Sequence, residues 1–91
     1  MFFVYVLYST KIHKRYIGKT GNIEKRLSEH NNGLSTWTKR GIPWVLTYYE
    51  AFLLSPDATK RESFLKSGRG RDYLDQILKT SINFLDNGMR V

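Results

Sequence analysis

The sequence contains no cysteine and only two prolines among its 91 residues. The lack of cysteine excludes both a disulfide framework and a thiolate metal site, so folding must depend on packing alone. No long hydrophobic run is present either, because the opening segment is apolar for about nine positions, against the ~20 residues that span a bilayer. The segment also lacks the basic start of a signal peptide. We therefore expect a soluble, cytoplasmic protein without a membrane partner.

Acidic residues are scarce, with eight Asp and Glu against 15 Lys and Arg, which gives a net charge of +7. The basic residues form two clusters, in residues 11–40 and 60–71. Such dense positive charge attracts polyanions through counterion release and electrostatic steering. We therefore expect nucleic acid as the partner and, in a bacterial cell, association with the nucleoid. An acidic membrane or protein surface is the weaker alternative.

Three segments rich in apolar, aromatic and β-branched residues predict strands. Phe2–Ser9 is an unbroken apolar run, typical of a strand that is covered on both faces. Arg15–Lys19 follows after a short polar connection, so these two segments predict a hairpin. Pro43–Phe52 predicts a third strand, because proline is tolerated where a strand begins.

Three further segments predict helices. Asn22 is a favourable N-cap for the first of them, which ends at an Asn-Asn-Gly stop. Ser55 is the expected N-cap of the second, which ends at about Ser67. Apolar residues at spacings of three and four predict a third helix over residues 71–79. Residues 80–91 have weak periodicity, which is typical of a partly ordered tail.

The predicted order of elements is β-β-α-β-α-α, which indicates an α/β (α+β) fold. A hairpin and a third strand form a small, three-stranded, mostly antiparallel sheet, and the helices must cover its apolar faces. A chain of 91 residues has room for one domain. We place that domain at residues 1–79 and the tail at residues 80–91.

Arg26 and His30 are the first candidates for chemistry. Their spacing of four residues places them on one face of the predicted helix. They flank the apolar side of that helix, at the rim of the core, where an active-site cleft can form. The more common meaning of this pattern is an ordinary basic helix edge.

Glu62 lies on the inward side of the predicted second helix, three residues before Leu65. An inward carboxylate among basic residues is either a metal ligand or one half of an ion pair, here with Lys66. Hydrolysis of a phosphodiester requires groups that activate water, neutralise charge on the phosphate and protonate the leaving oxygen. A carboxylate that holds a metal can meet the first two requirements. The position alone leaves both alternatives open.

For several other side chains, a structural role is the common alternative to a functional one. Tyr5 and Tyr16 lie on the paired strands, where a phenol usually belongs to the core. Lys19 ends the second strand and is typically a solvated charge. Trp37, in a basic loop, either stacks on an unpaired base or, more commonly, anchors its loop. His13 has no partner in the sequence pattern, and we assign it no role.

Four elements of the chain carry a resemblance to a known family. Phe3–Tyr5, followed after ten residues by Tyr16–Gly18, resembles the motif pair that names the GIY-YIG nuclease superfamily. The second motif is matched letter for letter, and the first keeps its tyrosine. Lys19–Asn31 is similar to the block that follows the second motif, and it also resembles the amino-terminal nuclease domain of the bacterial excision-repair enzyme UvrC. Lys60–Lys66 is similar to the helix that carries the family's metal-binding glutamate.

The resemblance implies a metal-dependent endonuclease that hydrolyses DNA. Low sequence specificity, or selectivity for branched or damaged structures, and a role in repair or recombination are further implications. By position, Arg26 would stabilise charge on the scissile phosphate, and Glu62 would hold one Mg²⁺ or Mn²⁺ ion. His30 would transfer protons, and Tyr5 or Tyr16 would orient or deprotonate water. Which of these last three is the general base stays open.

Other residues are expected to contact the nucleic acid without taking part in chemistry. The expected contacts are Lys19, Lys39, Arg40, Lys66, Arg69, Arg71 and Trp37. RNA is retained beside DNA as a partner.

The chain departs from the family pattern in one respect. Many members have an asparagine downstream of the glutamate, but the nearest one here is Asn83, to which we do not assign that role. This departure supports a second hypothesis, a catalytically weak or inactive DNA- or RNA-binding module of the same fold.

Overall fold

The structure is a computed structural model, and it describes residues 1–88. Its elements in chain order are β1 (Phe2–Ser9), β2 (Lys14–Thr20), α1 (Ile23–Asn31), the 3₁₀ helix η1 (Lys39–Gly41), β3 (Trp44–Phe52), α2 (Ser55–Lys66) and α3 (Gly68–Asp86). The three strands form one antiparallel sheet in the order β2-β1-β3. The predicted α+β fold and its order β-β-α-β-α-α are therefore confirmed.

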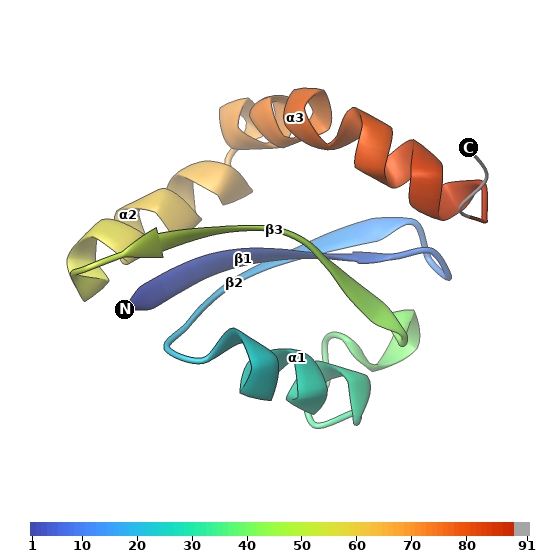
Figure 1. The fold of residues 1–91 in the computed structure, drawn as a ribbon, viewed down its shortest axis with the longest axis horizontal. Helices are drawn as coiled ribbons and strands as arrows, with labels where there is room; N and C mark the ends of the chain where they lie inside the picture. Colours follow the sequence, from blue (N-terminus) through green and yellow to red (C-terminus); the bar gives the residue numbers. More distant parts are fainter. Residues whose placement is uncertain (89–91) are drawn as a thin grey trace.

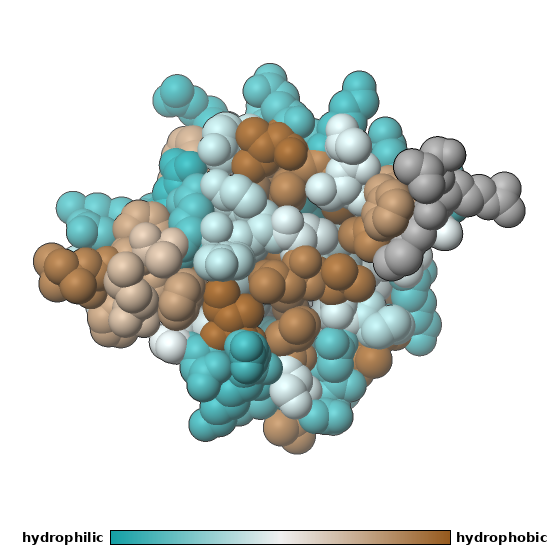
Figure 2. Space-filling model, in the orientation of Figure 1, coloured by the Kyte–Doolittle hydropathy of each residue, from teal (hydrophilic) through white to brown (hydrophobic). Residues whose placement is uncertain are grey.

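Helices cover both faces of the sheet. α2 and α3 lie on one face, and α1 lies on the other (Figure 1). Because side chains alternate along a strand, β1 supplies both cores: Val4 and Val6 pack with Leu74 on the α2–α3 side, whereas Tyr5 and Leu7 lie on the α1 side. Hydrophilic side chains cover the outer surfaces of the helices in the view of Figure 2, and hydrophobic ones gather at the level of the sheet.

A short polar residue caps the first of these helices but not the second. Asn22 caps α1 as predicted, since its side-chain oxygen accepts a hydrogen bond from the Lys25 amide at 3.1 Å. The prediction of Ser55 as N-cap of α2 is wrong by one residue, because Leu54 holds that position and Ser55 is already helical. The Ser55 hydroxyl instead accepts a hydrogen bond from Lys19 Nζ at 3.0 Å, which joins α2 to β2.

α3 begins earlier than the predicted helix. It starts at Gly68, after an N-cap at Ser67 whose hydroxyl accepts a hydrogen bond from the Gly70 amide at 3.2 Å. A Cβ atom at Gly70 would overlap the carbonyl oxygen of Phe64 in α2. Glycine at this position therefore lets α3 start directly against α2, where the sequence alone indicated a break.

α3 also ends later than predicted. It continues to Asp86, so residues 80–86 of the predicted tail are helical, whereas 89–91 lie outside the described residues. The Asp86 carboxylate accepts a hydrogen bond from the Tyr8 hydroxyl at 2.9 Å and lies 3.2 Å from Nδ1 of His13. None of the helices in residues 1–88 combines the length and the apolar character needed to cross a bilayer.

Candidate active site

Two phenols lie on the α1 face of the sheet, close to the edge that β2 forms. Strand pairing places Tyr5 of β1 opposite Gly18 of β2. A Cβ atom at Gly18 would overlap the Tyr5 hydroxyl, so only glycine allows the Tyr5 ring to extend across the neighbouring strand. The Tyr16 ring lies beside it, with 6.3 Å between the two ring centroids. The glycine of the second sequence motif is therefore required for the position of the tyrosine in the first.

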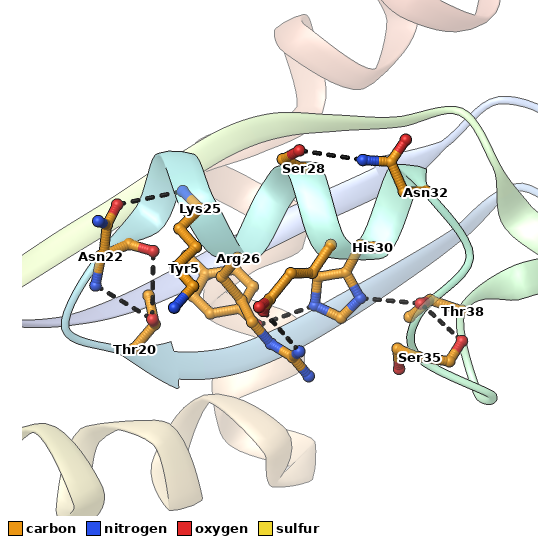
Figure 3. Close-up of polar contacts among 11 residues, drawn as sticks. Tyr5, Thr20, Asn22, Lys25, Arg26, Ser28, His30, Asn32, Ser35 and Thr38 are labelled. Carbon is orange, nitrogen blue, oxygen red and sulfur yellow. Dashed lines mark hydrogen bonds and ion pairs between the residues drawn. The ribbon is translucent and has the colours of Figure 1, made fainter.

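α1 adds an imidazole, that of His30, beside the Tyr5 phenol (Figure 3). His30 is fully buried, and its Nε2 lies 3.0 Å from the Tyr5 hydroxyl. Its ring centroid is 4.8 Å from that of Tyr16. Its other nitrogen, Nδ1, lies 2.8 Å from the hydroxyl of Thr38, in the loop that follows α1. The structure thus brings together three of the predicted catalytic residues and adds a fourth side chain, that of Thr38.

These hydrogen bonds determine the tautomer of His30. The Thr38 hydroxyl donates to the carbonyl oxygen of Ser35 at 3.3 Å, so it can only accept from His30. Nδ1 therefore carries the proton, and Nε2 accepts the hydrogen bond that the Tyr5 hydroxyl donates. One continuous chain of donors and acceptors leads from Tyr5 through His30 to the backbone of the loop.

The surroundings keep both ends of the Tyr5–His30 pair neutral at pH 7. Burial lowers the pKa of His30, and the positive charge of Arg26 lowers it further. Burial raises the pKa of Tyr5, although a hydrogen bond from Arg26 opposes that rise. The charges of Tyr16 and Glu62 also raise the Tyr5 pKa, which places the Glu62 carboxylate within electrostatic range of the phenols. An uncharged phenol thus faces an imidazole nitrogen whose lone pair can accept a proton.

Arg26 lies one turn before His30 on α1, as the spacing predicts. Its Nη1 donates to Glu29 Oε1 at 3.1 Å, and 34% of its side chain is exposed. The guanidinium lies close enough to Tyr5 to influence the pKa of the phenol. A permanently charged group is therefore half exposed at the entrance to the buried pair.

Glu62 comes from α2, which lies on the other face of the sheet. Its side chain is 22% exposed, and Oε2 accepts a hydrogen bond from Lys66 at 3.0 Å. The neighbouring Arg61 fixes α2 against β3, because Nε and Nη2 donate to the two carboxylate oxygens of Glu50 at 2.7 and 3.0 Å. The ion pair that the sequence offered as an alternative is present, and the carboxylate is still accessible to a ligand.

Glu62 is the carboxylate that fits a metal in this arrangement. Residues 1–88 contain no group of three or more His, Asp or Glu side chains that could hold a metal ion by themselves. Mg²⁺ in phosphoryl-transfer sites is commonly held by one or two carboxylates, by waters and by the phosphates of the substrate. A divalent ion held by Glu62 would therefore need waters and the phosphates of the substrate as its further ligands.

The structure gathers some of the predicted nucleic-acid contacts beside this site. Lys66 and Arg71 line an open groove together with Tyr16 and with Arg15, which the sequence had not singled out. Arg15 Nη1 lies 2.7 Å from the carboxylate of Asp75, which fixes the guanidinium at the groove. Because Tyr16 belongs to both, the groove is continuous with the candidate active site.

Other predicted contacts lie elsewhere. Lys19 donates to the hydroxyls of Ser55 and Thr59 at 3.0 and 2.8 Å, so its ammonium group faces α2. Arg69 lines a separate hollow with Tyr73. Lys39 and Arg40 are exposed on η1, at the opposite end of the site from the groove. For each of these, a contact with nucleic acid stays a prediction.

The loop after α1 is anchored by a residue other than Trp37. Trp37 does not anchor the loop, because 88% of its surface is exposed. Thr38 has that role instead: it is 1% exposed, and its carbonyl oxygen accepts a hydrogen bond from the indole nitrogen of Trp44 at 2.7 Å. No periodic pattern in the sequence marks Thr38, since its partners come from other elements.

Asn83, the asparagine downstream of the glutamate, lies on the other side of the sheet. It lines a hollow with Tyr8, His13 and Arg15 beside α3.

Comparison with known proteins gives one family and several relatives. The model of the GIY-YIG catalytic domain matches residues 1–73. UPF0213 protein CPE1444 of Clostridium perfringens is 37% identical over 83 residues, which are 90% of this chain and 88% of that protein. UPF0213 protein SH2523 of Staphylococcus haemolyticus is 36% identical over 66 residues, which are 71% of this chain and 79% of that protein. No solved structure matches the chain.

Proposed function

Since the chain belongs to the GIY-YIG catalytic-domain family, a family of nucleases, we propose that it is a metal-dependent endonuclease that hydrolyses DNA phosphodiester bonds. The observation that carries the proposal is the Tyr5–His30 hydrogen bond of 3.0 Å, with the Arg26 guanidinium and the Glu62 carboxylate in electrostatic range of Tyr5. A proton acceptor, a fixed positive charge and a metal ligand together can activate water and neutralise charge on the phosphate, which are two of the three requirements of phosphodiester hydrolysis.

The proton path begins at the hydroxyl of Tyr5. Its raised pKa keeps it protonated at pH 7, so it can accept a proton from the attacking water only while it gives up its own. His30 Nε2, 3.0 Å away, is the acceptor for that proton. The Thr38 hydroxyl on Nδ1 holds the ring in the required tautomer. Tyr5 is thus the general base and His30 its proton acceptor, and the half-buried Tyr16 orients the water.

Arg26 stabilises the negative charge that develops on the phosphate. The guanidinium is already placed beside Tyr5, so it needs little reorganisation when the phosphate arrives. The hydrogen bond from Arg26 to Glu29 keeps the group oriented in the free protein. Its planar set of donors suits two phosphate oxygens at once.

Glu62 would hold one Mg²⁺ or Mn²⁺ ion together with waters and the phosphate. When bound, such an ion polarises the phosphate and neutralises part of its charge. Lys66 already neutralises Glu62 in part. This ion pair is the observation that favours the second candidate function, a binding module of the same fold with weak or no turnover.

The groove lined by Arg15, Lys66 and Arg71 leads the DNA backbone to the site. Contacts to phosphate position a nucleic acid without reading its bases, so we propose low sequence specificity. A small nuclease of this kind suits DNA repair or recombination, where the shape of the DNA and not its sequence defines the substrate.

The test is nicking of supercoiled plasmid by the purified protein in Mg²⁺, in Mn²⁺ and in EDTA. We expect nicking that requires the metal and that is lost in Glu62→Gln. Glu24→Gln is the matched control, because it removes the same charge from an exposed position on α1. Binding of DNA in EDTA should persist in both variants. Metal-independent nicking, or equal nicking by Glu62→Gln and the wild type, would contradict the proposed role of Glu62. DNA binding by the wild type without any nicking would support the binding module.

A further inference from the structure

Trp37 is the most exposed of the aromatic side chains in residues 1–88. It is 88% exposed, whereas the other tryptophan, Trp44, is 5% exposed. Leu34, in the same loop, is 72% exposed. An indole exposed to this extent is free to stack on a planar partner.

The loop that carries Trp37 is held firmly at its base. The Thr38 amide donates to the carbonyl oxygen of Ser35 at 3.2 Å, and the Gly41 amide donates to the carbonyl oxygen of Thr38 at 3.1 Å. The same Thr38 carbonyl oxygen accepts a hydrogen bond from the Trp44 indole at 2.7 Å. Trp37 is therefore exposed on a well-anchored turn, so its exposure is a property of the fold.

Trp37 is next in the sequence to a residue that contacts the proposed catalytic pair. Its neighbour Thr38 contacts His30 at 2.8 Å, and His30 contacts Tyr5 at 3.0 Å. On the other side of Thr38, Lys39 and Arg40 are exposed. An aromatic plane with basic residues beside it matches a single-stranded nucleic acid, in which phosphates alternate with unstacked bases.

We propose that Trp37 stacks on an unpaired base beside the phosphate that is cleaved, while Lys39 and Arg40 bind the neighbouring phosphates. In a continuous duplex both faces of every base are covered by neighbouring bases, so an exposed indole has nothing to stack on. The substrate is accordingly a nucleic acid with single-stranded nucleotides next to the cleavage point, such as a flap, a gap or a loop. This inference rests on the proposed function for the cleavage, but the stacking itself does not depend on turnover.

The experiment measures binding in EDTA to three forms of one DNA: a blunt duplex, the duplex with a short single-stranded flap, and the duplex with a flap of abasic nucleotides. The abasic flap keeps the phosphates and removes the bases, so it separates charge from stacking. We expect Trp37→Ala to weaken binding of the normal flap by about tenfold, and Trp37→Phe to weaken it less, because both rings can stack. Affinities for the abasic flap and for the blunt duplex should change less than about twofold. Leu34→Ala is the matched control from the same loop, and we expect it to bind all three DNAs like the wild type.

An equal effect of Trp37→Ala on all three DNAs would overturn the inference, and so would no effect on any of them. In the latter case the exposed pair of Trp37 and Leu34 would instead be a contact for another protein. Because binding in EDTA needs no turnover, the stacking proposal and the endonuclease proposal can be contradicted independently. Loss of flap binding in Trp37→Ala by a protein that never nicks DNA would support stacking and contradict the endonuclease. Nicking by a protein whose affinity for the flap does not depend on Trp37 would support the endonuclease and contradict stacking.

Discussion

The two faces of the sheet bury different kinds of side chain. Beneath α2 and α3 the fully buried residues are aliphatic, as Val4 and Leu74 illustrate. Beneath α1 the buried set includes a phenol, an imidazole and a hydroxyl, those of Tyr5, His30 and Thr38. Burial of polar groups costs free energy unless each is hydrogen-bonded. Within residues 1–88, no buried side-chain nitrogen or oxygen lacks a hydrogen-bond partner. The comparison indicates that the aliphatic residues beneath α2 and α3 provide stability, whereas the buried polar residues beneath α1 provide chemistry, to which α2 adds the Glu62 carboxylate.

The largest effect is expected on the aliphatic face. Leu74→Ala should reduce the free energy of unfolding by about 2–5 kcal/mol, because it leaves a cavity between α3 and the sheet. Chemical denaturation measures the loss. Ile77→Ala, on the same helix but 41% exposed, is the control and should cost much less. If the rate of nicking per folded molecule also fell in Leu74→Ala, the division between the two faces would not hold.

Removal of the cation on the α1 face should act on rate and not on stability. Arg26→Ala should slow cleavage by about 10²–10³-fold, the usual effect of losing one group that stabilises charge in the transition state. Single-turnover nicking at saturating protein measures it. Lys25→Ala removes an exposed cation from the preceding position, and we expect at most a small effect on the rate. Equal losses in the two variants would mean that Arg26 contributes only general positive charge.

Thr38→Val tests the buried polar chain on the α1 face. Valine has a similar shape, but it leaves the Nδ1 hydrogen of His30 without an acceptor. The expected loss of stability is about 1–3 kcal/mol, with slower cleavage because the tautomer of His30 is no longer fixed. Denaturation and the NMR signals of the imidazole nitrogens report the two effects. Thr36→Val, exposed in the same loop, should change neither.

The smallest expected effect is a pH dependence of stability. His30 has a lowered pKa in the folded protein, so below pH ~6.5 the unfolded chain binds a proton at this position that the folded chain does not. Stability should therefore fall as the pH decreases from about 6.5, with a slope of at most ~1.4 kcal/mol per pH unit until His30 is protonated in the folded state too. Cleavage should decline only at lower pH, where His30 becomes protonated in the folded protein and can no longer accept a proton. His30→Gln should lose this part of the pH dependence, and an unchanged slope in that variant would contradict a neutral, buried His30.

The sequence predicts the parts of this molecule that depend on near neighbours. The order of elements follows from local patterns, and Arg26 and His30 share a face because a helix repeats every 3.6 residues. The sequence does not predict contacts that only the tertiary fold creates. Thr38 is an ordinary polar residue until β1 and α1 bring Tyr5 and His30 to it.

Glycine shows the same limit. A glycine at this position of the sequence indicates a helix break. In the fold, however, Gly70 allows α3 to start against the Phe64 carbonyl of α2. Trp37 illustrates the opposite case, since apolar residues in loops usually serve as anchors and this one is exposed. The sequence pattern alone shows neither the close approach of α2 at Gly70 nor the exposure of Trp37.

The central claim is that Tyr5 and His30 act as one proton-transfer unit in hydrolysis. A double-mutant cycle of metal-dependent cleavage rates with Tyr5→Phe, His30→Gln and the double variant tests it most directly. Because residues that act as a unit have strongly non-additive effects, we expect the double variant to be about as slow as the slower single variant. Losses that simply multiply in the double variant, or a wild-type rate no greater than in EDTA, would contradict the claim.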